Sequence, residues 1–199
     1  MAPWLPPIHI TSLPPGDAPL RLSARHARDA PLSIYPRDCI ESGSFPRGWF
    51  VNCREVQIGR GRTAYLQCAA ALERLECMEH DWLRVCEESG MLAVCARQFG
   101  VIWLTNANRM LPRTRSDSHG KRTSTVGWQC TQKHVLAGEE QLRVEWDRAS
   151  GAVTFRVLSY SRPRHPFAVV ALPVVLLQQR RFARDATRAM EAAATSGAS

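Results

Sequence analysis

The chain has 199 residues, of which 45% are hydrophobic, so it is long enough for one well-buried core but short for two independent domains. Its 26 basic and 18 acidic residues give a formal net charge of +8, which favours an anionic partner such as nucleic acid or a lipid surface. The longest apolar run, residues 167–177, contains Pro173 and is too short for a membrane span of about twenty residues. The N-terminus also lacks the basic-then-apolar layout of a secretory signal.

The seven cysteines are spread through segments with helix or strand patterns, and no C-x-x-C pair occurs among them. An odd number without metal-ligand spacing is typical of free, mostly buried thiols in a reducing, intracellular compartment. We therefore expect no metal site and no cofactor. The cytoplasm is the expected location, with import into an organelle left open by Arg21, Arg25 and Arg28.

The first 31 residues hold seven prolines and no sustained apolar periodicity, which predicts an extended or disordered arm. A single α+β domain is predicted at residues 32–192, followed by a flexible tail at residues 193–199. The domain begins with an alternating strand at residues 49–58, and a Gly-Arg-Gly turn then leads into an amphipathic helix capped by Thr63.

The remaining elements follow from apolar runs and turn signals. Strands are predicted at residues 91–95, 100–105, 126–134, 141–146 and 153–160, and a mobile basic loop at residues 111–125. From residue 167 the pattern becomes helical, with an apolar face from Leu172 to Met190 and with Arg180, Arg184 and Arg188 on another face. This order predicts an antiparallel sheet cupped around a long C-terminal helix, an arrangement that resembles the helix-grip fold of START-like lipid-binding domains.

Two parts of the sequence are similar to an uncharacterised family, catalogued as domain of unknown function 1990. The first part consists of residues 48–52, 59–62 and 81–82, and the second of residues 134–140, 160–163 and 179–184. Within the second part, Phe182-Ala183-Arg184 is especially like the plant-type members. The resemblance covers roughly residues 31–192. Lys133 stands where the family usually has a glycine before the histidine. The resemblance implies no reaction, because the family has no established activity.

The most site-like cluster is His134 with Glu139 and Glu140, since a histidine and two carboxylates that converge can act as acid, base or metal ligands. In a strand the two glutamates point to opposite faces, so at most one of them shares a face with a given partner. A turn in which Gly138 and the carboxylates cap backbone donors is the commoner meaning of such a cluster.

Two further places have the residues for anion binding. Ser161 and Arg162 lie where a strand reaches the mouth of the predicted cup, although Ser161 also suits a simple strand end before Pro163. Gly59 and Gly61, with Arg62 beside them, precede a helix and can present backbone amides to a phosphate. A tight strand-to-helix turn needs glycine in any case.

Three functions are compatible with these patterns. The leading hypothesis is a ligand-binding or scaffolding domain whose cup holds an apolar or amphipathic small molecule in a closed cavity of about 300 Å³ or more. The second is a hydrolase or isomerase-like enzyme that uses His134 with Glu139 or Glu140 and needs them in one pocket. The third is a basic RNA- or ribonucleoprotein-associated component that uses the arm, the loop at residues 109–122 and the arginine face of the last helix.

Overall fold

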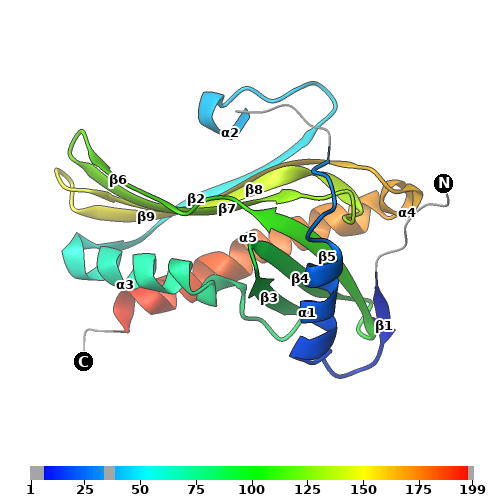
Figure 1. The fold of residues 1–199 in the computed structure, drawn as a ribbon. Helices are drawn as coiled ribbons and strands as arrows, with labels where there is room; N and C mark the ends of the chain where they lie inside the picture. The colour runs from blue at the N-terminus through cyan, green and yellow to red at the C-terminus, as the bar shows by residue number, and fades with distance from the viewer. Residues whose placement is uncertain (1–6, 34–38, 197–199) are drawn as a thin grey trace.

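The computed structural model describes residues 7–33 and 39–196, which form one strongly bent antiparallel sheet with helices packed on it (Figure 1). The strands are β1 (Ile8–Ile10), β2 (Phe50–Arg60), β3 (Leu83–Glu88), β4 (Met91–Gln98), β5 (Ile102–Met110), β6 (Thr114–Ser118), β7 (Lys121–Cys130), β8 (Leu136–Asp147) and β9 (Ala152–Pro163). The helices are α1 (Asp17–His26), α2 (Cys39–Ser42), α3 (Gly61–Glu73), the 3-10 turn η1 (Glu76–Met78), α4 (Pro166–Val170) and α5 (Leu172–Thr195).

The sheet has the order β2-β9-β8-β7-β5-β4-β3, with β1 added to β5 and β6 added to β7. Helices α3 and α5 lie along the concave face, and the main core lies between them and the strands (Figure 1). This arrangement confirms the predicted fold class, an antiparallel sheet cupped around a long C-terminal helix of helix-grip type.

Alternation along the strands assigns side chains to the two faces of the sheet. On β9, Val153, Phe155 and Val157 are buried in the main core under the helices. Leu158 and Tyr160 instead pack on the opposite face, against Cys39, Ile40 and neighbouring aromatic side chains. Both faces of β9 are therefore covered at these positions.

Helix α5 has the two faces predicted from its sequence. Phe182, Ala186 and Met190 are buried against the sheet and α3, whereas Arg180, Arg184 and Arg188 are exposed. Pro173 lies in the first turn of α5, where a missing backbone N–H costs nothing, and the short helix α4 precedes it. Helix α5 reaches Thr195, so the first part of the predicted flexible tail is helical.

The prediction of an extended or disordered arm at residues 1–31 is wrong for residues 7–31, which the structure describes. Strand β1 pairs with β5, and Leu20, Ala24 and Ala27 are buried against the outer face of β3, β4 and β5. Three small or apolar side chains at helical spacing are enough to dock a short helix, and Pro19 is tolerated because it lies in the first turn of α1. Residues 1–6 lie outside the described part.

The mobile loop predicted at residues 111–125 is also wrong. Strands β6 and β7 form a hairpin across His119 and Gly120, which both have positive φ angles. Every residue of β6 is exposed, so no apolar alternation marks it in the sequence. Strand β7 begins at Lys121 and ends at Cys130, which leaves His134 in the connection that follows, outside any strand.

Candidate functional site

A cavity of about 270 Å³ lies between the bent sheet and α5, slightly smaller than the 300 Å³ expected, and it is partly open to the surface and not closed as predicted. Alternation on two strands brings Val94, Ala96 and Gln98 of β4 and Leu104, Asn106 and Asn108 of β5 to its wall. Helix α5 supplies the opposite wall with Val174, Val175, Gln178, Gln179 and Phe182. Trp82 and Trp128 also line the cavity. Most of the lining is apolar, and the polar groups are few.

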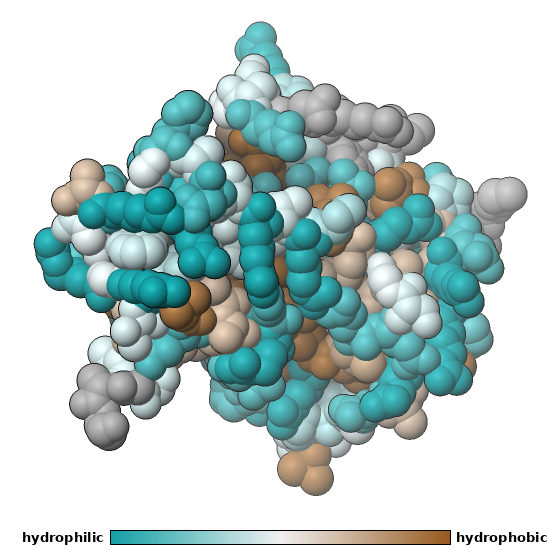
Figure 2. Space-filling model, turned by 60° about the vertical axis from the view of Figure 1, so that its left-hand side comes forward, coloured by the Kyte–Doolittle hydropathy of each residue, from teal (hydrophilic) through white to brown (hydrophobic). Residues whose placement is uncertain are grey.

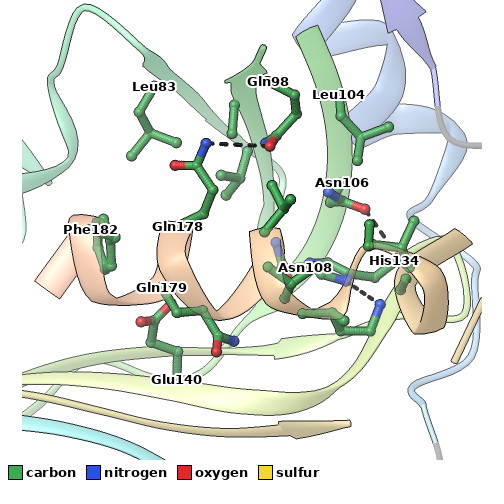
Figure 3. A pocket seen from close by; sticks show the side chains of 18 of the residues that line it. Leu83, Gln98, Leu104, Asn106, Asn108, His134, Glu140, Gln178, Gln179 and Phe182 are labelled. Atoms are coloured by element: carbon green, nitrogen blue, oxygen red, sulfur yellow. Dashed lines mark hydrogen bonds between the residues drawn. The ribbon is translucent and has the colours of Figure 1, made fainter. Parts of the chain in front are cut away.

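Several of the polar side chains are held by hydrogen bonds. The Oδ1 atom of Asn106 accepts a bond from the backbone N–H of Val135 at 3.2 Å. Gln178 Nε2 donates to the carbonyl oxygen of Arg97 at 3.2 Å and to Gln98 Oε1 at 3.3 Å, so Gln178 points from α5 toward the end of β4 (Figure 3). These bonds fix the orientation of the amides around the cavity.

Two acceptor atoms in the lining have no such partner. Asn108 is 1% exposed, and its Oδ1 atom has no hydrogen bond within the described chain, while its Nδ2 atom donates to the carbonyl oxygen of Leu92 at 3.4 Å. The Oε1 atom of Gln178 is buried without a partner in the same way. Buried acceptors without a donor cost free energy, about 1–3 kcal/mol each, so they mark places where a bound molecule or water completes the structure.

Glu140 reaches the cavity from β8, on the sheet side of α5 (Figure 3). Burial raises the pKa of its carboxyl group to about 8, and burial is the only cause of the shift. No cation and no hydrogen-bond donor among the described residues counteracts this rise in the pKa. At pH 7 the carboxyl group is therefore largely protonated and uncharged.

His134 lies in the connection before β8 and lines the same cavity. Its Nδ1 atom accepts a hydrogen bond from the backbone N–H of Leu136 at 2.9 Å, so the neutral ring carries its proton on Nε2. Burial lowers the pKa of the imidazole to about 4. The cavity is thus close to electrically neutral at pH 7, although it contains two titratable side chains.

The structure brings His134 and Glu140 to one cavity but not Glu139. Strand alternation turns Glu139 to the other face, where its Oε2 atom accepts a hydrogen bond from Gln129 Nε2 at 2.9 Å. The expectation that the two glutamates separate is correct. Within the described chain, no hydrogen bond or ion pair joins His134 to Glu140.

Ser161 and Arg162, expected to form an anion site together, point to opposite faces of β9. Ser161 is buried under α5, where its Oγ atom accepts a hydrogen bond from Gln179 Nε2 at 3.0 Å. The guanidinium carbon of Arg162 lies 4.9 Å from the ring centroid of Trp49, on the outer face. The two side chains therefore do not share a site.

The Gly59–Gly61 turn lies away from the cavity, and packing accounts for it. A Cβ atom on Gly59 would lie 3.1 Å from that of Ala64 and 3.2 Å from that of Ala194, so glycine allows the end of β2 to approach both helices. Gly61 has a φ angle of 83°, and its N–H donates to the carbonyl oxygen of Gly151 at 2.7 Å. This amide is not free for a phosphate, and Arg62 is exposed beside it.

The polar cavity residues other than His134 and Glu140 were not predicted. Asn106 and Asn108 follow Leu104 at intervals of two, which places three side chains on one face of a strand, but the predicted strand ends at Thr105. Gln178 and Gln179 interrupt the apolar face of α5. Amides in an otherwise apolar, inward-facing pattern are the signal that would have found these residues.

Many basic side chains outside the cavity are neutralised by carboxylates. In the β6–β7 region Arg113 pairs with Glu87, Arg115 with Glu73, Lys121 with Glu145 and Arg148 with Asp117. The face drawn in Figure 2 is mostly hydrophilic, with hydrophobic patches visible between polar side chains. The basic segment at residues 109–122 therefore forms part of an ion-paired surface.

All seven cysteines are free thiols, and five of them are buried. Among residues 7–33 and 39–196, no cluster of three or more His, Cys, Asp or Glu side chains is arranged to hold a metal ion. None of the helices in the described part of the chain is long and apolar enough to cross a membrane.

The topology defines a helix-grip domain with a cavity between the sheet and α5. The family model described as "Domain of unknown function (DUF1990)" matches residues 35–189, and the chain belongs to this family. The family resemblance seen in the sequence is thereby confirmed.

Relatives occur in distant organisms. A UPF0548 protein of Arabidopsis thaliana is 28% identical over 155 residues, which cover 72% of each chain. A UPF0548 protein of Deinococcus radiodurans is 28% identical over 156 residues, covering 70% of this chain and 75% of the relative.

Solved structures with a similar arrangement include Ara h 8.0201 and human STARD10. Ara h 8.0201 has a TM-score of 0.44 and 12% sequence identity, with 75% of this chain and 100% of that chain covered. STARD10 has a TM-score of 0.43 and 10% identity, with 86% and 84% covered. At these values the likeness is confined to the general arrangement of the chain.

Proposed function

We propose that this protein binds an apolar or amphipathic small molecule in the cavity between the sheet and α5. The observation that carries the proposal is the cavity itself, about 270 Å³ of space lined mainly by apolar side chains inside the folded domain. Sites for small molecules are typically of this kind, with a few polar groups that fix orientation. A bound apolar molecule would cover the apolar lining and so would stabilise the folded state.

The charge states of the two titratable side chains in the cavity also support binding of an apolar ligand. With Glu140 largely protonated and His134 neutral at pH 7, an apolar group would enter without stripping water from a full charge. A scaffolding role, the other part of the leading hypothesis, needs no such space and leaves the unpaired Asn108 and Gln178 oxygens unexplained.

Titration with the neutral, environment-sensitive dye N-phenyl-1-naphthylamine tests the proposal. Trp82 and Trp128 line the cavity, so excitation of tryptophan should transfer energy to a dye bound there. We expect saturable binding of one dye per chain, with tryptophan-sensitised dye emission that n-octanol reverses by competition. Unsaturable dye emission, or emission that n-octanol leaves unchanged, would count against a binding cavity.

A further inference from the structure

We propose that the ligand is an amine, an apolar molecule whose protonated amino group pairs with the carboxylate of Glu140. This inference rests on the proposed function and names the chemical class of the ligand. It starts from the location of Glu140, a carboxyl group that lines the cavity and has no ion pair or hydrogen bond among the described residues. The surroundings of this carboxyl group disfavour its ionised form, and a cationic ligand would stabilise that form.

The unpaired amide oxygens point independently to a ligand that brings hydrogen-bond donors. Rotating the Gln178 amide by 180° would set its oxygen against the oxygens of Arg97 and Gln98, so Oε1 is the atom left free. The Asn108 amide is fixed in the same sense by its bond to the carbonyl oxygen of Leu92. A ligand rich in acceptors, such as a carboxylate, would leave these two amide oxygens unsatisfied.

The groups that face Glu140 from the neighbouring elements include no described cation at neutral pH. His134 approaches from the connection before β8 and is neutral, because its pKa lies near 4. Cys77 of η1 and Cys130 of β7 interact with the Glu140 charge as thiols, and burial keeps both protonated. Helix α5 presents amides and Phe182 to the cavity. A ligand ammonium group would therefore supply the countercharge that allows Glu140 to ionise.

This pairing predicts a characteristic pH dependence. A primary alkylamine keeps its proton to about pH 10, as a lysine side chain does. With the pKa of Glu140 near 8 before binding, the ionised fraction of Glu140 rises from about 1% at pH 6 to about half at pH 8. If only the ionised form accepts the ammonium group, the affinity for an alkylamine rises about 50-fold over that interval.

Isothermal titration of n-octylamine, n-octanol and octanoate at pH 6, 8 and 9 tests the inference, because the three probes share one alkyl chain. For the wild-type protein we expect octylamine affinity to rise about 50-fold from pH 6 to pH 8, whereas octanol affinity stays within about twofold. Octanoate should bind most weakly at pH 9. Glu140→Gln should abolish the rise for octylamine, and Glu139→Gln, on the other face of the sheet, should retain it.

The outcomes separate this inference from the proposed function. Octanol binding with a flat octylamine profile, or with octanoate as the tightest probe, overturns the amine assignment and leaves the cavity as an apolar site. The same holds if Glu140→Gln keeps the pH rise. If neither the neutral dye nor any of the three probes binds, both proposals fall.

Discussion

Replacing Val174 with tryptophan should weaken dye binding by about 100-fold, equivalent to about 2.8 kcal/mol of binding free energy. Val174 lines the cavity from α5, and an indole at this position would occupy much of the 270 Å³ that a ligand needs. Because the added indole would project into the cavity and not into packed side chains, the variant should remain folded. The dissociation constant of the dye measures the effect.

The matched control is Leu177→Trp, three residues further along the same helix. Leu177 is 63% exposed and does not line the cavity, so the same substitution there leaves the ligand space unchanged. Its dye affinity should stay within about twofold of the wild-type value, a difference below 0.5 kcal/mol. A folded Val174→Trp protein that binds dye as tightly as Leu177→Trp would show that the dye sits elsewhere.

Glu140 should make the stability of the unliganded protein fall between pH 6.5 and pH 8. Burial raises the pKa of Glu140 from an ordinary value of 4.5 to about 8, so the folded protein holds this proton more tightly than the unfolded chain does. The favourable contribution is complete below pH 4.5 and is lost as the pH rises through 8. At about 1.4 kcal/mol per pH unit, the loss from pH 6.5 to pH 8 is about 2 kcal/mol.

His134 acts in the opposite direction and in another pH window. Burial lowers the pKa of its imidazole from 6.5 to about 4, so the unfolded chain binds this proton more tightly and stability is lost as the pH falls below 6.5. Between pH 4.5 and 6.5 the two effects oppose each other. Above pH 6.5 the contribution of Glu140 remains without this opposition.

Urea denaturation of the wild type and of Glu140→Gln at pH 6.5 and pH 8 measures the Glu140 contribution. The glutamine side chain cannot ionise, so the stability of the variant relative to the wild type should grow by about 2 kcal/mol between the two pH values. Taking the difference between the proteins removes the contributions of groups that titrate alike in both. Glu139→Gln should follow the wild-type profile, and an equal pH dependence in all three proteins would contradict the raised pKa of Glu140.

The fold was predictable for the elements in which buried apolar residues recur at a regular spacing along the sequence. The alternation on β9 and the apolar face of α5 are both visible in the sequence, because each element packs one face against the core. Helix α1 and strand β6 were missed for the opposite reason. The prolines near α1 obscure a short buried face, and all of β6 is exposed, so neither has a strong periodic signal.

The candidate site was predictable only in part. Strand alternation correctly separates Glu139 from Glu140, which is a local property of the backbone. The cavity, in contrast, depends on how α5 lies opposite β4 and β5, which are separated from it by more than sixty residues in the chain. The roles of Asn108 and Gln178 come from this long-range packing, and no short motif encodes it.

The most direct test of the binding cavity is native mass spectrometry of the protein purified from its own cells, with extraction and identification of bound small molecules. The wild-type protein should carry an apolar or amphipathic molecule, which denaturation releases and which is absent from Val174→Trp but present in Leu177→Trp. An amine among the released molecules would further support pairing with Glu140. A wild-type protein of unliganded mass with an empty extract, or one whose bound molecule persists unchanged in Val174→Trp, would contradict the account.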